Sequence, residues 1–325
     1  MSKEIELWQF IGDRLRSGER VVLLVVGESH GSSPGRAGYK MAVAANGDLI
    51  GSIGGGVMEV NLVEQARELL RGQATGNYRG IAIEQEHRRN SDHPSGMICS
   101  GTQTVIFAEL RPAELAAVEL IIAVLKKKEH PWLWISEESF RSSDEDIEPQ
   151  SCRLPYFEKM EEFFEYHDKV GPKNELIIIG GGHCALALSE LMSRMDFSIR
   201  IFDDRPELNT LQKNKFADSI TVIDNYESIA EHIDDSPAAY VVIMTLGYRT
   251  DEIVIRQLIG RQFKYFGVLG SRAKMATLLK QLKNEGFPQQ PLDAIRTPIG
   301  IPINSHTPEE IAVSIAAEII SVKNA

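Results

Sequence analysis

The chain has 325 residues, enough for two domains, and its 43% hydrophobic and 25% charged residues are the proportions of an ordinary globular protein. The 35 Lys and Arg against 46 Asp and Glu give a net charge of −11, which argues against general nucleic-acid binding and leaves any anionic ligand to local groups. No apolar run reaches membrane-spanning length, no signal peptide is evident, and three scattered cysteines form no disulfide framework or zinc motif, so we expect a cytoplasmic protein with free thiols.

Residues 1–125 are expected to form one α/β domain. Apolar periodicity and turn residues predict, in chain order, a helix over 5–15, strands over 21–26, 39–45 and 48–53, a helix over 57–70, strands over 81–83 and 102–110, and a helix over 113–125. The dipeptide Asn46-Gly47 is the strongest hairpin signal, because a tight two-residue turn needs residues that accept positive φ.

Residues 126–172 are expected to connect two domains. They begin with three lysines, where cations suit the end of the preceding helix, and include a short strand over 132–135. The run over 137–148 is acidic and serine-rich, which favours a solvated loop over a docking site.

Residues 173–325 are predicted to form a Rossmann-like, doubly wound α/β domain. Helices alternate with strands over 175–179, 198–202, 220–223, 239–245 and 264–269, an order that implies a parallel sheet with right-handed crossovers. The last helix is well specified, because Thr307 and Glu310 form a capping box around Pro308 at the first helical position.

The first strand of this domain runs directly into a glycine turn. Gly180, Gly182 and Ala185 fit G-x-G-x-x-A, in which glycines allow a close backbone approach to a pyrophosphate at the helix N-terminus. Asp203 ends the next strand about 20 residues later, where this fold places its ribose-binding acid. These residues predict a nucleotide or phosphate ligand; the alternative is a tight turn with a purely structural role.

Two more helices begin at glycines. Gly54, Gly55 and Gly56 allow a concave row of N–H groups that suits an anion. Glu59 follows in the first turn, where it either stabilises the helix dipole or contacts a ligand or transfers a proton.

At Gly270-Ser271-Arg272, the helix opens with Arg272 and Lys274, two cations that oppose its dipole. A bound anion would remove this conflict; otherwise both side chains extend into water.

The loop over 27–38 is a fourth candidate, because glycine- and serine-rich loops beside rigid hairpins commonly carry function. Ser32, Ser33 and His30 can donate hydrogen bonds there, and Arg36 is its only cation. An ordinary surface loop is the equal alternative.

The cysteines and histidines offer weaker signals. Cys184 lies in a first helical turn, where the dipole lowers a thiol pKa, although a packing role is favoured. Cys99 could hold a sulfur- or metal-bearing ligand or be inert. His87, His93 and Cys99 lack a regular ligand spacing, so no metal site is predicted. No catalytic triad or phosphate-loop lysine stands out.

Short motifs occur along nearly the whole chain except 126–172. They are Gly31-Ser32-Ser33-Pro34-Gly35-Arg36-Ala37-Gly38, Gly51-Ser52-Ile53-Gly54-Gly55-Gly56-Val57-Met58-Glu59, Cys99-Ser100-Gly101, Gly180-Gly181-Gly182-His183, Asp203-Asp204-Arg205-Pro206 and Leu269-Gly270-Ser271-Arg272. In this order they resemble the motifs G-S-S-P-R-x-x-G, G-S-x-x-G-G-x-x-E, C-G-G, G-A-G-H, D-D-R-P and L-G-S-R of the XdhC/CoxI family, accessory proteins of xanthine dehydrogenase and related molybdenum hydroxylases.

The resemblance implies a chaperone without turnover of its own. Members of the family are regarded as binding the molybdenum cofactor, protecting it during sulfuration by a cysteine desulfurase, and delivering it to the apo-hydroxylase, here xanthine dehydrogenase of purine catabolism or a relative. Molybdopterin carries a dithiolene and a terminal phosphate, which suit the anion sites above. The expected cofactor-binding residues are Ser32, Ser33, Arg36, Gly54, Gly55, Gly56, Gly180, Gly182, His183, Asp203, Gly270, Ser271 and Arg272, with Glu59 and Cys99 as candidates for a catalytic role.

Two positions depart from the family's pattern. Val57 stands where one branch has cysteine, and the run from Thr245 to Tyr248 lacks the usual T-H-x-H histidines, although Asp251 is retained. The alternative function is an NAD(P)-dependent oxidoreductase, as the Rossmann half alone suggests; a third is a nucleotide-sensing scaffold. A closed homodimer is expected, because two-fold assemblies are the commonest soluble oligomers.

Overall fold

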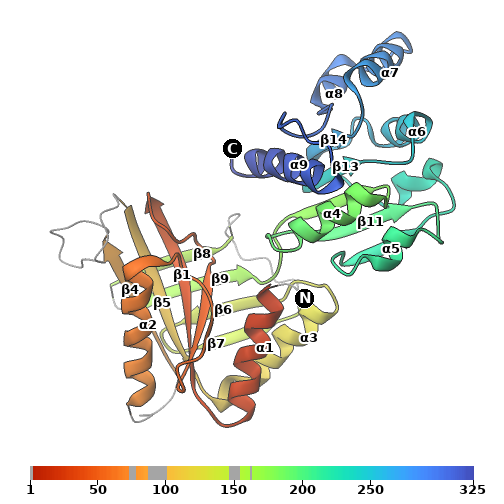
Figure 1. The fold of residues 1–325 in the computed structure, drawn as a ribbon. Coiled ribbons are helices and arrows are strands. Elements are labelled where there is room, and N and C mark those ends of the chain that lie inside the picture. Colours follow the sequence, from red (N-terminus) through yellow and green to blue (C-terminus); the bar gives the residue numbers. More distant parts are fainter. Residues whose placement is uncertain (1–2, 73–77, 87–100, 146–153, 162) are drawn as a thin grey trace. The chain divides into compact units, whose positions relative to one another are not determined.

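The computed structural model describes residues 3–72, 78–86, 101–145, 154–161 and 163–325 (Figure 1). The chain divides into two compact units, Met1–Gly171 and Pro172–Ala325. The predicted α/β fold class is confirmed in both. Within the described ranges, no helix has the length and apolar character needed to cross a membrane.

The first unit contains an antiparallel sheet with strand order β3-β2-β1-β5-β4. Helix α2 covers one face of this sheet, and α1 and α3 lie on the other side (Figure 1). The elements are α1 (Lys3–Arg16), β1 (Val21–Gly31), β2 (Lys40–Ala44), β3 (Leu49–Gly51), α2 (Gly56–Arg71), β4 (Arg79–Glu86), β5 (Gly101–Leu110), the 3-10 turn η1 (Pro112–Glu114) and α3 (Leu115–Lys126).

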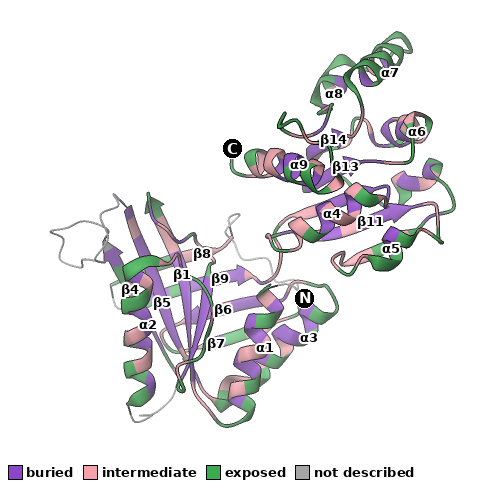
Figure 2. Ribbon diagram, in the orientation of Figure 1, coloured by how far each residue is buried: buried purple, intermediate pink, exposed green. Residues whose placement is uncertain are grey.

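Strand β1 is buried on both faces, which explains its uninterrupted apolar run (Figure 2). Val21, Leu23 and Val25 pack with α1 and α3, whereas the intervening valines and leucine pack with α2. A bulge at Gly27 then shifts the pairing with β5, so that Val26 faces Val105 but Glu28 faces Thr104.

The segment 126–172, which the sequence predicted as a connector, belongs to the first unit up to Gly171. Its described residues include a second antiparallel sheet of order β7-β6-β9-β8, from β6 (Trp132–Ser136), β7 (Phe140–Ser143), β8 (Tyr156–Met160) and β9 (Phe163–Lys169). Leu133, Ile135 and Tyr166 belong to the core that also contains α1 and α3. These strands therefore complete the first unit, and part of the expected acidic loop is β7.

A buried lysine links three elements of this unit. Lys40 Nζ on β2 lies 3.1 Å from Glu4 Oε1 on α1 and 3.1 Å from Asp168 Oδ2 on β9, and Tyr166 donates its hydroxyl to the same Asp168 oxygen. Burial alone would lower the pKa of Lys40, but the attraction of both carboxylates raises it above its ordinary value.

The second unit is a parallel sheet of order β12-β11-β10-β13-β14 with helices on both faces. Helices α4 and α9 pack on one face, and α6, α7 and α8 on the other. The elements are β10 (Glu175–Ile179), α4 (His183–Met192), β11 (Ser198–Asp203), α5 (Asn209–Lys213), β12 (Ser219–Val222), η2 (Tyr226–Glu231), β13 (Ser236–Ile243), α6 (Tyr248–Leu258), β14 (Phe263–Val268), α7 (Arg272–Asn284), α8 (Gln289–Ala294) and α9 (Pro308–Lys323).

The predicted capping box of the last helix is present. Glu310 N–H donates to Thr307 Oγ1 at 3.2 Å, and Thr307 N–H donates to Glu310 Oε2 at 3.1 Å. The segment after α8 extends the sheet, because Arg296 forms a parallel bridge with Gly267 of β14.

Candidate functional site

The structure brings two of the predicted anion-binding segments together in the first unit. The loop after β1 contacts the glycines before α2 so closely that a Cβ on Gly54 would lie 2.5 Å from Gly35 N. A Cβ on Gly35 would lie 2.3 Å from Ile53 O. Gly54 also has φ 129°, which side chains rarely adopt. Both glycines are therefore needed for the close approach of the two segments.

Gln103 of β5 holds the two segments against each other, and sequence reasoning missed it. Its Oε1 accepts hydrogen bonds from Ser33 Oγ at 2.7 Å and Gly35 N at 3.1 Å, while its Nε2 donates to Ile53 O at 2.9 Å. The side chain is buried, and each of these partners is also shielded from water. A glutamine near the start of a strand that continues as an apolar run was the only signal that could have found it.

The row of N–H groups beside the glycines already holds a carboxylate. Glu59 Oε2 accepts hydrogen bonds from Ser52 Oγ at 2.7 Å, Ile53 N at 2.9 Å and Gly55 N at 3.0 Å. Gly54 N–H donates instead to Ser52 Oγ at 3.2 Å. The amides of Ile53 and Gly55 therefore bind an anion of the chain itself, that of Gly54 is engaged by Ser52, and the donors left for a ligand are those of the first turn of α2.

Ser32 and Arg36 are exposed next to the contact between the loop after β1 and the glycines before α2. Ser33 is buried within that contact. Arg36 donates to Ser33 O at 3.2 Å and forms no ion pair with any described residue. His30 lies 3.3 Å from Glu28. Cys99 falls outside the described residues, as do His87 and His93. In the first unit the candidate site thus consists of Ser32, Arg36 and the start of α2, positioned by Gln103 and Glu59.

In the second unit the predicted glycine turn follows β10. Gly180 has φ 106°, and a Cβ there would lie 2.3 Å from Met244 O on the neighbouring strand segment. A Cβ on Gly181 would meet Leu211 at 2.2 Å, so packing also requires the middle glycine. Gly182 caps α4 with open space beside it, and His183 is exposed in the first turn. The turn therefore leaves the N-terminus of α4 open, and a nucleotide or phosphate ligand there stays a prediction.

Asp203 is fully buried, and both carboxylate oxygens already have donors. Gly181 N–H donates to Oδ2 at 2.6 Å, and the Arg205 side chain donates to both oxygens, at 2.8 and 2.7 Å. Burial alone would raise the pKa of Asp203, but hydrogen bonds from Arg205 and Gly181 hold it below its ordinary value. The carboxylate of Asp203 thus stabilises the glycine turn through its hydrogen bond with Gly181. Its contact with a ribose stays a prediction.

The start of α7 keeps the electrostatic conflict that the sequence indicated. Ser271, Arg272 and Lys274 are all exposed, and the Ser271 side chain makes no capping hydrogen bond. Arg272 and Lys274 form no ion pair with any described residue. Two uncompensated cations therefore adjoin the positive end of a helix dipole, which is the arrangement an anion would stabilise.

A buried carboxylate lies after β13. Asp251 Oδ1 accepts hydrogen bonds from Thr245 N at 3.1 Å and Thr245 Oγ1 at 2.6 Å. Burial raises the pKa of Asp251, although the Thr245 hydrogen bonds oppose this. Asp251 thus fixes the strand-to-helix loop where the family's usual histidines are replaced.

Cys184 lies partly buried against the core of the second unit, in agreement with the packing role that the sequence favoured. Burial raises the pKa of this thiol, and Glu309 raises it further.

Comparison with known proteins gives consistent matches across both units. The model of the "XdhC and CoxI family" matches residues 14–79, and that of the "XdhC Rossmann domain" matches residues 176–319. A crystal structure of a xanthine dehydrogenase from Bacillus halodurans has the same fold, with a TM-score of 0.71 and 23% identity over 100% of this chain and 96% of that chain.

Two curated relatives are similar in sequence. The chain is 24% identical to a probable xanthine dehydrogenase subunit from Bacillus subtilis (strain 168), covering 95% of each. It is 25% identical to the "Uncharacterized protein YqeB" of Escherichia coli (strain K12), over 91% of this chain but 42% of that relative. The chain thus spans less than half the length of the E. coli protein. The two matched regions contain the glycine turns of both units, and the chain belongs to the XdhC and CoxI family.

Proposed function

We propose that this protein is a molybdenum cofactor chaperone that protects sulfurated molybdopterin and inserts it into xanthine dehydrogenase or a related molybdenum hydroxylase. The observation that carries the proposal is the pair of open, amide-lined helix starts at α2 and α4 in a chain of the XdhC and CoxI family. Neither adjoins a set of acid, base and nucleophile among the described residues, which suits binding without turnover.

The chemistry of the cofactor fits the donors of the first unit. Arg36 and the first-turn N–H groups of α2 suit a terminal phosphate, because guanidinium and helix N-termini both bind anions. Glu59 fills the deeper amides, so the phosphate is expected at Gly56 rather than at Gly54 or Gly55. In the second unit, taken by itself, His183, Ser271 and Arg272 are exposed and remain the candidate donors to an anion.

The partners follow from the same proposal. The names of the B. subtilis and B. halodurans proteins support an association with xanthine dehydrogenase. Three scattered cysteines cannot ligate the iron–sulfur clusters of such an enzyme, so we assign this chain the accessory role rather than the oxidation itself. A cysteine desulfurase is the expected sulfur source, and a homodimer the expected assembly.

The test is cofactor binding and rescue. The full chain, purified without oxygen from cells that make molybdopterin, is expected to carry the pterin, identified by mass spectrometry after denaturation. Restoring the gene to a deletion strain is expected to raise the activity of the client hydroxylase. Absence of both binding and rescue would overturn the proposal.

A second candidate is an NAD(P)-dependent oxidoreductase, favoured by the strand order of the parallel sheet and the glycine turn at Gly180. The partly exposed Asp204 is then more accessible to a ribose than Asp203, which is buried and engaged with Gly181 and Arg205. Titration with NAD and NADP, followed by absorbance at the nicotinamide band with purine and aldehyde substrates, separates the two functions. Turnover without added hydroxylase would favour the oxidoreductase.

A further inference from the structure

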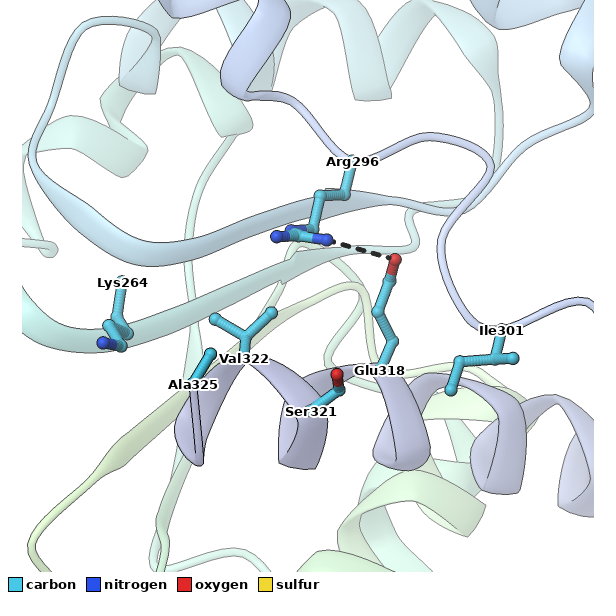
Figure 3. A pocket seen from close by; sticks show the side chains of 7 residues that line it. All are labelled: Lys264, Arg296, Ile301, Glu318, Ser321, Val322 and Ala325. Carbon is cyan, nitrogen blue, oxygen red and sulfur yellow. Dashed lines mark ion pairs between the residues drawn. The ribbon is translucent and has the colours of Figure 1, made fainter.

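The second unit contains a cavity of about 460 Å³, open to solvent, between the edge strand β14 and α9, and none of its lining residues belongs to the glycine turns. This volume is within the usual range of small-molecule sites. The residues around it are Lys264, Arg296, Ile301, Glu318, Ser321, Val322 and Ala325 (Figure 3).

Arg296 is fixed in place at this cavity. Its backbone is held against β14, because its N–H donates to Phe266 O at 2.9 Å and its carbonyl accepts Val268 N–H at 3.0 Å. Its guanidinium lies 5.7 Å from the centre of the Tyr265 ring, a cation–π contact. The side chain is 48% exposed, so it is positioned without being covered.

Glu318 orients Arg296 but leaves its donors free. Glu318 Oε2 accepts the Tyr265 hydroxyl at 2.5 Å and Gly300 N–H at 2.8 Å, which fixes the carboxylate. Burial, followed by the hydrogen bond to Glu318, raises the pKa of Tyr265, so its hydroxyl stays a donor. The remaining oxygen, Oε1, is 3.7 Å from Arg296 Nη1, beyond a direct hydrogen bond.

Arg256 in the same unit is an arginine whose guanidinium is already engaged by carboxylates, and it differs from Arg296 in this respect. Arg256 bonds directly to Glu252 at 2.7 Å and to Glu285 at 2.5 Å. The Arg296 guanidinium, by comparison, has no hydrogen-bond acceptor among the described residues. Its fork of N–H groups therefore retains the capacity to bind a planar, two-oxygen anion.

The other walls suit a ligand that is anionic at one end and apolar at the other. Lys264 is a second, exposed cation without an ion pair among the described residues, so the lining has two cations and one carboxylate side chain. Ile301 and Val322 supply apolar surface. The last turn of α9 places the negative end of a helix dipole beside Ser321, which disfavours a doubly charged phosphate more than a single carboxylate.

We infer that this cavity binds a small organic carboxylate, with its oxygens on Arg296 and its apolar body against Ile301 and Val322. The site is independent of the cofactor-binding function proposed above, because it shares no residue with the glycine turns. The carboxylate is expected on the Arg296 side, away from the C-terminal end of α9.

Benzoate is a suitable probe, and saturation-transfer NMR with calorimetry on the full chain measures its binding. We expect benzoate to bind, Arg296→Gln to weaken it at least tenfold, and the uncharged benzyl alcohol not to bind. Val322→Trp, which fills the cavity without touching the charges, is expected to abolish binding as well. Arg249→Gln is the matched control, because Arg249 is an exposed arginine of the same unit with no ion pair among the described residues.

Failure of benzoate to bind would overturn the inference, as would binding that both Arg296→Gln and Val322→Trp leave unchanged. Inorganic phosphate that binds as tightly as benzoate, with the same sensitivity to Arg296→Gln, would overturn the assignment to carboxylates. If Arg296→Gln unfolds, Val322→Trp decides the matter alone, since it keeps the ion pair with Glu318.

Discussion

Glu59 reaches back from the first turn of α2 and accepts the N–H of Gly55 at 3.0 Å, so that the chain fills part of its own anion-binding turn. Ser52 and Ile53 donate to the same oxygen. The sequence pattern indicated a ligand site at the start of α2. Some of the N–H groups there bind the carboxylate of Glu59, and the others remain available to a ligand.

Replacing Glu59 with alanine is expected to lower the free energy of unfolding by about 1–3 kcal/mol, because three donors lose a charged acceptor. The emptied row can then bind an external anion, so sulfate should raise the Tm of this variant more than that of the wild type. Thermal denaturation in sulfate and chloride at equal ionic strength measures this.

Glu64→Ala is the control for that experiment, because Glu64 lies on the same helix and pairs with Arg67 and Arg71 at the surface. It should respond to sulfate as the wild type does. An equal sulfate response in the Glu59 variant would show that the amide row is not an anion site.

Gln103→Leu keeps the side-chain volume but removes all three hydrogen bonds between the loop and the glycine segment. We expect a loss of about 1–3 kcal/mol, since buried donors and acceptors are left unpaired. Hydrogen exchange should accelerate at Gly35 while the amides of α9 keep their protection. Unchanged exchange at Gly35 would contradict the role given to Gln103.

Asp203→Asn is expected to destabilise the second unit, because the charged acceptor of Gly181 and Arg205 is lost. The pKa of Asp203 is lowered in the folded state, so its stabilisation is present above the unfolded pKa of about 3.9 and lost as pH falls through the lower folded value. The stability difference between wild type and variant, from urea titrations, should therefore be constant near neutral pH and shrink below about pH 4. A difference independent of pH would refute this. Asp204→Asn is the neighbouring control.

Lys40→Met is expected to cost roughly 3–5 kcal/mol, because Asp168 is left buried without its cation. The pKa of Lys40 is raised, so its contribution is complete below the unfolded lysine value of about 10.4 and disappears only as pH rises further. Denaturant titrations at pH 7 and pH 9 should give the same loss. The double variant Lys40→Met with Asp168→Leu is expected to recover part of it; no recovery would mean that packing, not charge, causes the loss.

Arg272→Ala is expected to weaken molybdopterin binding at least tenfold while NAD affinity is unchanged, if the start of α7 serves the pterin cofactor. Lys280→Ala, an exposed cation later on the same helix, is the matched control. Equal loss of both ligands would favour the nucleotide-sensing scaffold instead.

Local patterns predicted most of the fold. The apolar run from Val21, the alternating helices and strands after Glu175, and the capping box at Thr307 all act through neighbours in sequence, and each forms the expected element. Of the four strands in the second antiparallel sheet, the sequence predicted only β6; β7, β8 and β9 were missed because polar residues are frequent in them. Their pairing with one another, not their composition, makes them a sheet.

The candidate site was predictable only in part for the same reason. Glycines beside helix starts identified the turns, since their conformational freedom is a local property. That Gln103 would bond Gly35 depends on a contact 68 residues apart in the chain, and no short pattern encodes it. Likewise, no short pattern indicated that Arg205 would pair with Asp203, whose contact with a ribose stays a prediction.

The extra residue at Gly27 has a consequence for which part of β1 is buried. Before Gly27, successive side chains of β1 alternate between two hydrophobic cores, so every position must be apolar. After Gly27, the pairing with β5 is shifted by one residue, and the strand leads into the candidate loop. A Cβ at Gly27 would lie 2.7 Å from the Phe157 ring, so a larger residue at position 27 would require this ring to move. The residues after Gly27 are therefore no longer shared between the two cores, and the strand can carry partly or fully exposed polar residues such as Glu28 and His30 into the candidate loop.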